Sequence, residues 1–448
     1  MIVMKFGGTS VESAAAIEKV ADIVRDRLDR KPVIVVSAMG KTTNRLLEIA
    51  AKAVSGNRRE ALVLLGQLEH FHRTESPAEA AGIITEHFQE LAALTDELAE
   101  LGDFPPQYVD LVSSYGERLS SQIVMLTFRQ LGIDATHVDS RSVIITDRRH
   151  TQAAPLYGRT YAKLEAIVKP LAEKQVVVMG GFIAATQDGF TTTLGRGGSD
   201  FTAAIAGAGI GAEEIQIWTD VDGMLTCDPR IVPGGHRVKI ISAAEAAELA
   251  YFGAKVLHPA TVVPAMEKNI PVLILNSKNP SSPGTRIVAG RVPCTNPVKS
   301  IACKKDITLV NIVSLRMLMA HGFLRRIFEV FDRYRTPVDL VTTSEVSVSL
   351  TIDNIEHLEE ICAELRQIAE VSVETNQALI CLVGDAIRDT CGVTLRVLEP
   401  LSGVNVRMIS QGASMLNLSL IVAGADLRRA VESLHTRLFA ELDPNVFD

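Results

Sequence analysis

Residues 192–206 read Thr-Thr-Leu-Gly-Arg-Gly-Gly-Ser-Asp-Phe-Thr-Ala-Ala-Ile-Ala, a glycine loop that carries one arginine and runs directly into a helix of small residues. Because glycine has no side chain, the backbone N–H groups of Gly195, Gly197 and Gly198 can approach an anion closely. The N-terminus of the following helix adds partial positive charge, and Arg196 can donate two parallel hydrogen bonds to a carboxylate or phosphate. The stretch therefore predicts a site for small anions.

Short apolar runs alternate with helical patterns along the first 295 residues. The run 33–36 is apolar on both faces, which is typical of a parallel strand covered by helices. Residues 11–28 repeat apolar side chains at helical spacing, with Thr9 and Ser10 as candidate N-caps, and residues 45–130 indicate a helical insert. We expect strands at 3–6, 32–37, 176–179, 215–219 and 271–275. This part of the chain predicts an α/β fold with an open, mostly parallel sheet between helices.

Polar or glycine-rich loops follow most of these strands. They are Lys5-Phe6-Gly7-Gly8, the segment from Ser37 to Asn44, Met-Gly-Gly-Phe at 179–182 and Trp-Thr-Asp-Val-Asp-Gly at 218–223. Because the carboxyl ends of parallel strands meet at one edge of a sheet, we expect these loops and the Arg196 loop to border one crevice. A single Gly-Gly turn is better explained as an ordinary strand–helix connection, and no phosphate-loop motif of the G-x-x-x-x-G-K-[ST] type is present. Five loops of this kind at one edge favour a binding site.

Four cations are available for phosphates and a carboxylate, namely Lys5, Arg196, Arg230 and Lys255. This set suits phosphoryl transfer, in which positioning and charge neutralisation provide most of the catalysis. Asp200, at the start of a helix, is placed to orient Lys5 or a magnesium-bound water. The sequence offers no obvious catalytic base, which favours a carboxylate acceptor, because a carboxylate is already ionised at neutral pH.

The chain changes character after about residue 279, where prolines, glycines and serines cluster up to residue 297. Residues 300–448 contain an internal repeat of about 66–70 residues in the ferredoxin-like order strand–helix–strand–strand–helix–strand. We therefore expect a catalytic domain at 1–295 and two α+β units at 300–375 and 376–448. The strand at 307–313 is also open to pairing with the second unit.

Composition limits the classes of partner. The 448 residues are 47% hydrophobic and 22% charged, with a net charge of −8 and no long Lys/Arg run, so we expect no nucleic-acid or membrane binding. Six cysteines form no C-x-x-C pair, no cluster has metal-ligand spacing, and His70 and His72 lie on a polar stretch that predicts solvated side chains. The N-terminus reads as a first strand rather than a signal peptide. We expect a cytoplasmic protein, or one carried elsewhere by a segment absent here.

Taken together, the motifs resemble those of aspartate kinases with the amino acid kinase fold and tandem ACT domains. The matching stretches are KFGGTS at 5–10, TTTLGRGGSD at 191–200, WTD at 218–220 and FGAKVLHP at 252–259, and the resemblance extends over nearly the whole chain. It is strongest to the monofunctional, lysine-sensitive enzymes. It implies transfer of the ATP γ-phosphate to L-aspartate, giving 4-phospho-L-aspartate, with Mg²⁺ held mainly by the nucleotide phosphates.

The resemblance also implies roles for individual residues. Lys5 and Asp200 would be catalytic. ATP would be bound by Lys5, Phe6, Gly7, Gly8, Thr219, Asp220, Leu225, Arg230, Lys255 and Val256. Aspartate would be bound by Ser37, Thr43, Glu117, Phe182, Arg196, Gly197, Gly198 and Ser199. The effector lysine would be bound by Met317, Ala320, Phe323, Leu324, Val338, Asp339, Ser344 and Glu345.

Three positions depart from the family pattern. Leu225 stands where a tyrosine is frequent near the nucleotide, Lys41 replaces a small residue, and Ala320 replaces a serine in the effector pattern. The resemblance further implies a homodimer or homotetramer assembled through the ACT domains. Two alternatives stay open at this point: a non-catalytic amino-acid sensor of the same fold, and a kinase for another acidic amino acid such as glutamate.

Overall fold

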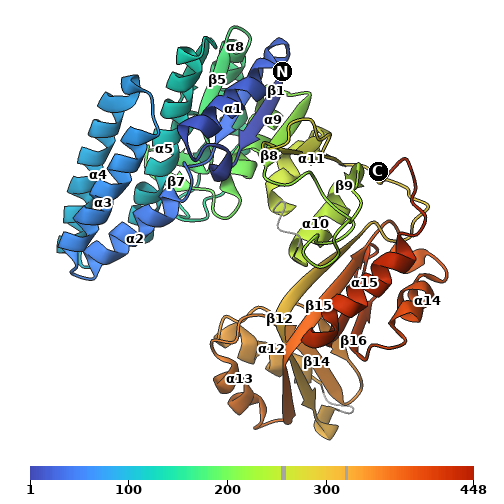
Figure 1. Ribbon diagram of the computed structural model, residues 1–448. Coiled ribbons are helices and arrows are strands. Elements are labelled where there is room, and N and C mark those ends of the chain that lie inside the picture. The colour runs from blue at the N-terminus through green and yellow to red at the C-terminus, as the bar shows by residue number, and fades with distance from the viewer. Residues whose placement is uncertain (254–258, 318–320) are drawn as a thin grey trace. The chain divides into compact units, whose positions relative to one another are not determined.

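Figure 1 shows the computed structural model, which describes residues 1–253, 259–317 and 321–448. Their contacts divide these residues into two compact units. The N-terminal unit comprises 1–224, 239–243 and 259–290, and the C-terminal unit comprises 225–238, 244–253, 291–317 and 321–448. The segments 225–238 and 244–253 thus group with the C-terminal unit although they lie early in the chain.

The N-terminal unit is built around an eight-stranded sheet in the order β3-β5-β2-β1-β8-β10-β11-β9. The first six of these strands run parallel, β11 is antiparallel to β10, and β9 is parallel to β11. The strands are β1 (Ile2–Phe6), β2 (Pro32–Val36), β3 (Ala135–Val138), β5 (Val176–Gly180), β8 (Glu214–Thr219), β9 (Ile240–Ser242), β10 (Val272–Asn276) and β11 (Thr285–Val288). This confirms the predicted open, mostly parallel sheet.

Helices pack on the two faces of this sheet (Figure 1). On one face, α5 contacts β2, β3 and β5, and α1 packs against α5; on the other face, α9 contacts β1 and β8 and itself packs against α7 and α11. Their bounds are α1 (Ala14–Arg25), α5 (Pro106–Gln130), α7 (Tyr157–Lys163), α9 (Gly198–Ile210) and α11 (Val263–Glu267). The side chain that caps α1 is Ser13, whose Oγ accepts a hydrogen bond from the Ala16 N–H at 3.2 Å. The predicted caps Thr9 and Ser10 were wrong, because both lie in a preceding 3₁₀ turn.

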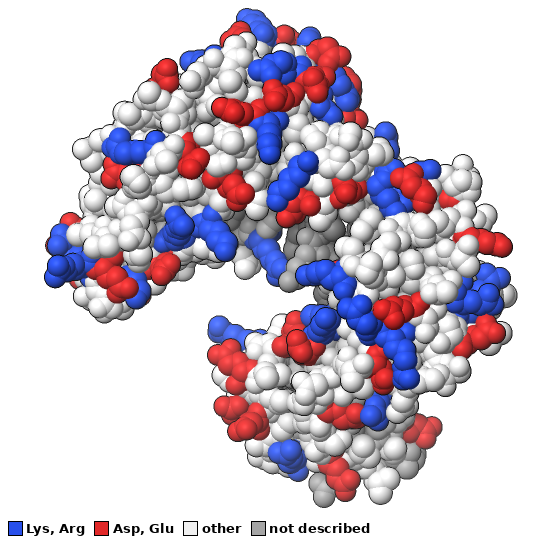
Figure 2. Space-filling model, in the orientation of Figure 1, with Lys and Arg blue, Asp and Glu red and all other residues white. Residues whose placement is uncertain are grey.

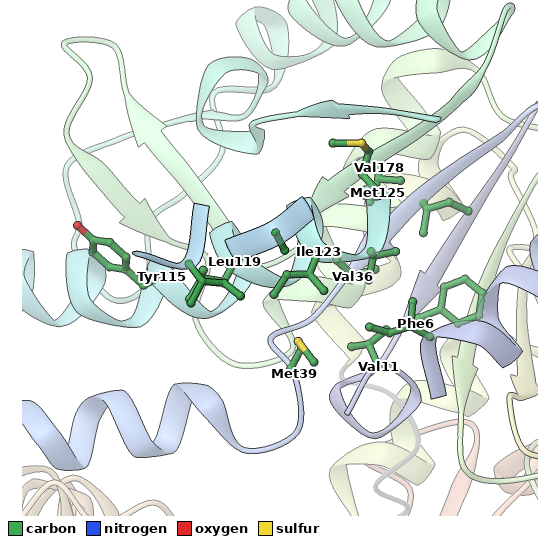
Figure 3. Packing of buried hydrophobic residues seen from close by; sticks show 14 of the residues in the cluster. Phe6, Val11, Val36, Met39, Tyr115, Leu119, Ile123, Met125 and Val178 are labelled. Carbon is green, nitrogen blue, oxygen red and sulfur yellow. The ribbon is translucent and has the colours of Figure 1, made fainter. Parts of the chain in front are cut away.

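The predicted helical region at 45–130 forms α2 (Thr42–Val54), α3 (Arg58–Thr74), α4 (Ala81–Leu101) and α5. Their apolar faces join those of β1, β2 and β5 in one buried cluster, part of which Figure 3 shows. There Leu119 and Ile123 of α5 lie beside Val36 and Met39, and Phe6 lies beside Val11. This packing fixes α5 against the carboxyl ends of β1 and β2.

A second, three-stranded sheet carries the glycine loop. It consists of β4 (Ile145–Thr146), β6 (Ile183–Thr186) and β7 (Thr191–Thr193). The Arg196 loop therefore follows a strand of this small sheet. The sequence had suggested that it follows a strand of the main sheet. It reaches the main sheet through α9, which contacts β1, β2 and β8.

The C-terminal unit contains a six-stranded antiparallel sheet in the order β13-β14-β12-β15-β17-β16. Two ferredoxin-like repeats share its long central strands, as the predicted repeat requires. The C-terminal end of β12, residues 309–313, pairs with residues 370–374 of β15. Its N-terminal end, residues 300–304, pairs with residues 379–383 of the same strand. The elements are β12 (Ser300–Val313), α12 (Phe323–Arg333), β13 (Val341–Thr343), β14 (Ser347–Ile352), α13 (Leu358–Leu365), β15 (Glu370–Val383), α14 (Val393–Leu398), β16 (Val406–Gln411), β17 (Asn417–Ala423) and α15 (Leu427–Leu438).

Charged side chains of both signs are interspersed on the face shown in Figure 2. Among the residues that the structure describes, no helix combines the length and the hydropathy that a membrane crossing requires.

Candidate active site

The loops after β1, β2, β5 and β8 meet at one edge of the main sheet. The strand ends are in register, because Phe6 pairs with both Val36 and Trp218, and Val36 pairs with Gly180. Backbone hydrogen bonds continue past the strand ends: the Gly7 N–H donates to the Trp218 carbonyl at 3.3 Å. The predicted crevice thus has a structural basis in this edge.

The two residues with predicted catalytic roles form an ion pair. Lys5 Nζ lies 2.6 Å from Asp200 Oδ1, and the two side chains are only 12% and 14% exposed. Lys5 is near the end of β1, and Asp200 is in the first turn of α9, where the helix dipole favours a negative charge. The Asp200 carboxylate holds the Lys5 ammonium group in place, so that one cation is fixed at the carboxyl end of β1.

The glycine loop projects its arginine toward solvent. Gly195 and Gly197 have φ values of 76° and 72°, which a side chain disfavours, and they flank Arg196. Arg196 is exposed, and within the described part of the chain no ion pair or hydrogen bond of its side chain is found. An arginine held between two such glycines is available for an incoming anion.

A buried glutamate faces the same edge from α5. Glu117 is 4% exposed; its Oε1 accepts a hydrogen bond from the Ala38 N–H at 3.1 Å. Its Oε2 has no hydrogen-bond partner in the described structure. Burial raises the pKa of Glu117 to about 8, against the opposing effects of backbone hydrogen bonds and of the Lys5 charge. A buried oxygen without a partner is costly, which points to a cationic or hydrogen-donating ligand at this position.

Close backbone packing shapes the floor between these groups. A Cβ on Gly181 would lie 2.6 Å from Ser199 Cβ, and a Cβ on Gly198 would lie 2.6 Å from Phe182 Cδ2. Phe182 itself has a φ of 65°, a strained value for an aromatic residue, and its N–H donates to Thr202 Oγ1 at 2.9 Å. The glycines after β5 and in the Arg196 loop therefore allow β5 and α9 to come together.

These residues line one open cavity of about 430 Å³. Its lining includes Lys5, Asp200 and every predicted aspartate-binding residue: Ser37, Thr43, Glu117, Phe182, Arg196, Gly197, Gly198 and Ser199. Asn44 and Gly195 also line it and were not among the predicted site residues. Both lie in loops that the sequence predicts to border the crevice, and that position is the signal that could have identified them.

The predicted nucleotide residues are distributed over several places. Phe6, Gly7 and Gly8 follow Lys5 at the sheet edge. Thr219 is the last residue of β8 and Asp220 follows it; the Thr219 hydroxyl donates to Asp220 Oδ1 at 3.3 Å. A Cβ on Gly8 would lie 2.9 Å from the Gly40 carbonyl oxygen. Leu225 and Arg230 belong to the C-terminal unit, and Lys255 and Val256 lie outside the described residues.

The predicted lysine-site residues are placed in the first ferredoxin-like repeat. Phe323 is buried in its apolar core, and Asp339 is paired with Lys304 Nζ at 3.0 Å. Ser344 Oγ is 2.6 Å from Ser347 Oγ, and Glu345 is exposed. Met317 and Val338 are half-buried against the same core, Leu324 is exposed, and Ala320 lies outside the described residues.

Comparison with known proteins agrees with this geometry. The sequence profile of the amino acid kinase family matches residues 1–276, and that of an ACT domain matches residues 380–438. The chain is 37% identical to the lysine-sensitive aspartokinase 3 of Escherichia coli, over 98% of this chain and 99% of that protein. It is 38% identical to the chloroplastic aspartokinase 2 of Arabidopsis thaliana, over 99% of this chain and 85% of that protein.

Solved structures give the same result. The crystal structure of E. coli aspartokinase III with lysine and aspartate superposes with a TM-score of 0.86, at 34% identity, and covers 98% of this chain and 99% of that one. The structure of the same enzyme with aspartate and ADP superposes with a TM-score of 0.81, at 36% identity, and covers 98% of this chain and 100% of that one. The chain therefore belongs to the amino acid kinase family and, within it, to the aspartokinases.

Proposed function

We propose that the cavity around Lys5, Glu117 and Arg196 binds L-aspartate and that its side-chain carboxylate receives the γ-phosphate of ATP, giving 4-phospho-L-aspartate and ADP. The observation that carries this proposal is the charge distribution of that one cavity. It combines a buried acid with an unpartnered oxygen, an exposed arginine and a lysine held by a carboxylate. An amino acid with two carboxylates and one ammonium group complements all three.

Each group has a distinct role in this proposal. Glu117 Oε2 accepts a hydrogen bond from the substrate ammonium, and Arg196 forms a bidentate pair with a substrate carboxylate. Lys5, oriented by Asp200, neutralises charge on the transferring phosphoryl group and stays in place during transfer. No base is required, because the attacking carboxylate oxygen is already ionised.

The nucleotide is proposed to lie along the edge formed by the ends of β1 and β8. Backbone N–H groups of Gly7 and Gly8, which have no side chain in the way, are available to phosphate oxygens. Among the described residues no group of three or more His, Cys, Asp or Glu could hold a metal ion. As the resemblance to aspartate kinases implies, Mg²⁺ would be held mainly by the nucleotide phosphates, where it would offset their charge. Cytoplasmic location stays a prediction.

A coupled assay with ATP and L-aspartate tests the reaction. We expect ADP release that depends on aspartate, and ADP no higher than in the blank without aspartate would contradict the proposal. Calorimetry with each ligand in the same preparation would then detect the alternative function, an amino-acid sensor that binds without turnover. Competition between aspartate and glutamate in one reaction separates the two acid substrates.

The Arg196→Ala variant tests the orientation of the substrate. We expect the KM for aspartate to rise about 100-fold, because a charge-assisted bidentate pair contributes roughly 1.5–3 kcal/mol or more. Calorimetric affinity for ADP should stay within two-fold of the wild type. Equal losses for both ligands would show that Arg196 contacts the nucleotide instead.

We further propose that the ACT repeats bind lysine and lower the activity, and that they join chains into a homodimer or homotetramer. The support is the acidic pair Asp339 and Glu345, whose charges suit the lysine ammonium groups. Because Asp339 already holds Lys304, effector binding would have to displace that contact or share it. We expect Asp339→Ala to weaken lysine inhibition, and unchanged inhibition would remove Asp339 from the site. Sedimentation of the purified chain measures the oligomer.

A further inference from the structure

A buried carboxylate on α5 anchors the strand that leads into the Arg196 loop. Asp110 is fully buried, and its Oδ1 accepts a hydrogen bond from the Thr193 hydroxyl at 2.5 Å. Thr193 is the last residue of β7 and precedes Arg196 by three positions. The Asp110 carboxylate therefore ties the start of the glycine loop to α5, whose apolar side chains belong to the core of the N-terminal unit.

The same carboxylate holds a second segment that packs beside the loop. Both oxygens of Asp110 accept from the Thr151 N–H at 3.0 Å, and Oδ2 lies 2.7 Å from His150 Nδ1. Thr151 has a φ of 69°, which is unfavourable for a β-branched residue and persists only where the surrounding structure holds it. The Thr151 carbonyl oxygen would lie 3.2 Å from a Cβ on Gly195, so this backbone packs directly against the glycine that precedes Arg196.

Helix α5 also carries the acid that is proposed to bind the substrate ammonium. Glu117 follows Asp110 by seven residues, which is close to two helical turns and about 10 Å along the axis. The two side chains therefore leave the same side of one helix. Glu117 lines the cavity together with Arg196, whereas Asp110 is not among the described residues that line it. The helix thus sets the separation between an acceptor for an ammonium group and a donor for a carboxylate.

We propose that Asp110 is a positioning residue for the acidic substrate: by anchoring the Arg196 loop to α5, it keeps Arg196 at the distance from Glu117 that the two ends of aspartate require. The inference rests on the proposed binding of aspartate by those two residues. A loop that shifts relative to α5 would lose or strain the bidentate pair, because hydrogen bonds weaken steeply as their geometry departs from the optimum. The loss of this anchor should therefore weaken aspartate binding and leave nucleotide binding unchanged.

Thr193→Val tests the proposal, with Thr192→Val as the matched control. Both threonines are buried in β7, at 2% and 0% exposed, but the Thr192 hydroxyl contacts Thr146 of the small sheet, at 2.7 Å, instead of α5. We expect Thr193→Val to raise the KM for aspartate about three- to ten-fold and to leave the calorimetric Kd for ADP within two-fold. Thr192→Val should match the wild type in both quantities. Thr193→Ser, which keeps the hydroxyl, should restore the KM.

Asp110→Ala removes all the hydrogen bonds of the anchor at once. We expect it to raise the KM for aspartate about ten- to 100-fold, which is more than Thr193→Val does, again with the Kd for ADP within two-fold. Should this variant fail to fold, the comparison of Thr193→Val, Thr193→Ser and Thr192→Val still tests the inference. Thermal melting of the two valine variants should show similar stability, so that a difference in KM reports on the position of the loop.

A double-mutant cycle with Arg196→Ala identifies the route of the effect. If the anchor acts through Arg196, then Thr193→Val should change the kcat/KM for aspartate by less than two-fold in the Arg196→Ala background. Additive effects, or a Thr193→Val variant equal to Thr192→Val, would overturn the inference while the proposed aspartate site survives. An Arg196→Ala variant with wild-type kcat/KM for aspartate would overturn both the proposed role of Arg196 and the inference.

Discussion

At the residue scale, the site is marked by ionisable side chains that are buried, although burial disfavours a charge. Glu117 is the clearest case, because it is almost fully buried and one of its oxygens has no partner. The sequence could place Glu117 near aspartate only through family resemblance. The unpartnered oxygen depends on how α5 packs against the loop after β2, which is a tertiary feature. By contrast, Lys5 and Arg196 could be predicted directly, since each lies beside glycines that the backbone geometry requires.

Glu117→Gln should separate stability from activity. The pKa of Glu117 is raised to about 8 in the folded chain, above its usual value of 4.5, so the unfolded chain releases this proton first as pH rises. As pH rises between those two values, the free energy of unfolding of the wild type therefore falls by about 1.4 kcal/mol per pH unit relative to that of the glutamine variant. We expect denaturant titrations to show the variant gaining relative stability from pH 5 to pH 8.

The same substitution should remove the acceptor for the substrate ammonium and raise the KM for aspartate about 100-fold. In the wild type, the KM for aspartate should fall as pH rises from 6.5 to 8, because the ionised carboxylate is the form that binds the ammonium. A flat KM over that range, or a variant with normal aspartate use, would show that Glu117 is only structural.

At the element scale, the alternation of apolar runs predicted five strands of the main sheet, β1, β2, β5, β8 and β10, to within a residue or two, but not β3, β9 or β11. The helical insert was also predicted, but not which face of each helix is buried. His72 shows why: it was expected to be solvated from its polar neighbours, yet it is fully buried between α2 and α4. Its Nδ1 lies 2.9 Å from the Leu68 carbonyl, and the Phe88 ring lies beside it. Local polarity does not reveal a face that is covered by a helix distant in sequence.

The insert should be acid-sensitive through His72. Burial lowers the pKa of His72 to about 4, so below its usual value of 6.5 the unfolded chain binds this proton while the folded chain does not. Stability should therefore fall as pH drops from 6.5 to 4, by about 1.4 kcal/mol per unit. We expect His72→Leu to reduce that slope in urea titrations at pH 5 and 7. His70→Leu, at an exposed position of the same helix, is the control and should leave the slope unchanged.

At the scale of the whole molecule, the order of the segments along the chain does not match their grouping into units by contacts. The composition shift near 279–297 predicted a boundary there, and that boundary remains a prediction. The two segments 225–238 and 244–253 could not be assigned to the C-terminal unit from sequence, because their partners are distant in the chain: Lys299 lies 54 positions after Glu245, and His435 lies 209 positions after Thr226. A fully buried ion pair between Glu245 and Lys299, at 2.8 Å, anchors the second of these segments.

A chain that ends at residue 290 tests this arrangement directly. It keeps Lys5, Glu117 and Arg196 but leaves Glu245 without Lys299 and the segment 225–238 without β12 and α15. Removing one partner of a buried ion pair costs about 3–5 kcal/mol, so we expect the fragment to aggregate or to lose ADP binding in calorimetry. Adding residues 291–448 as a separate chain should restore ADP affinity, because it supplies the missing partners. A monodisperse 1–290 fragment with full-length affinity for ADP would show that the nucleotide binds without the C-terminal repeats.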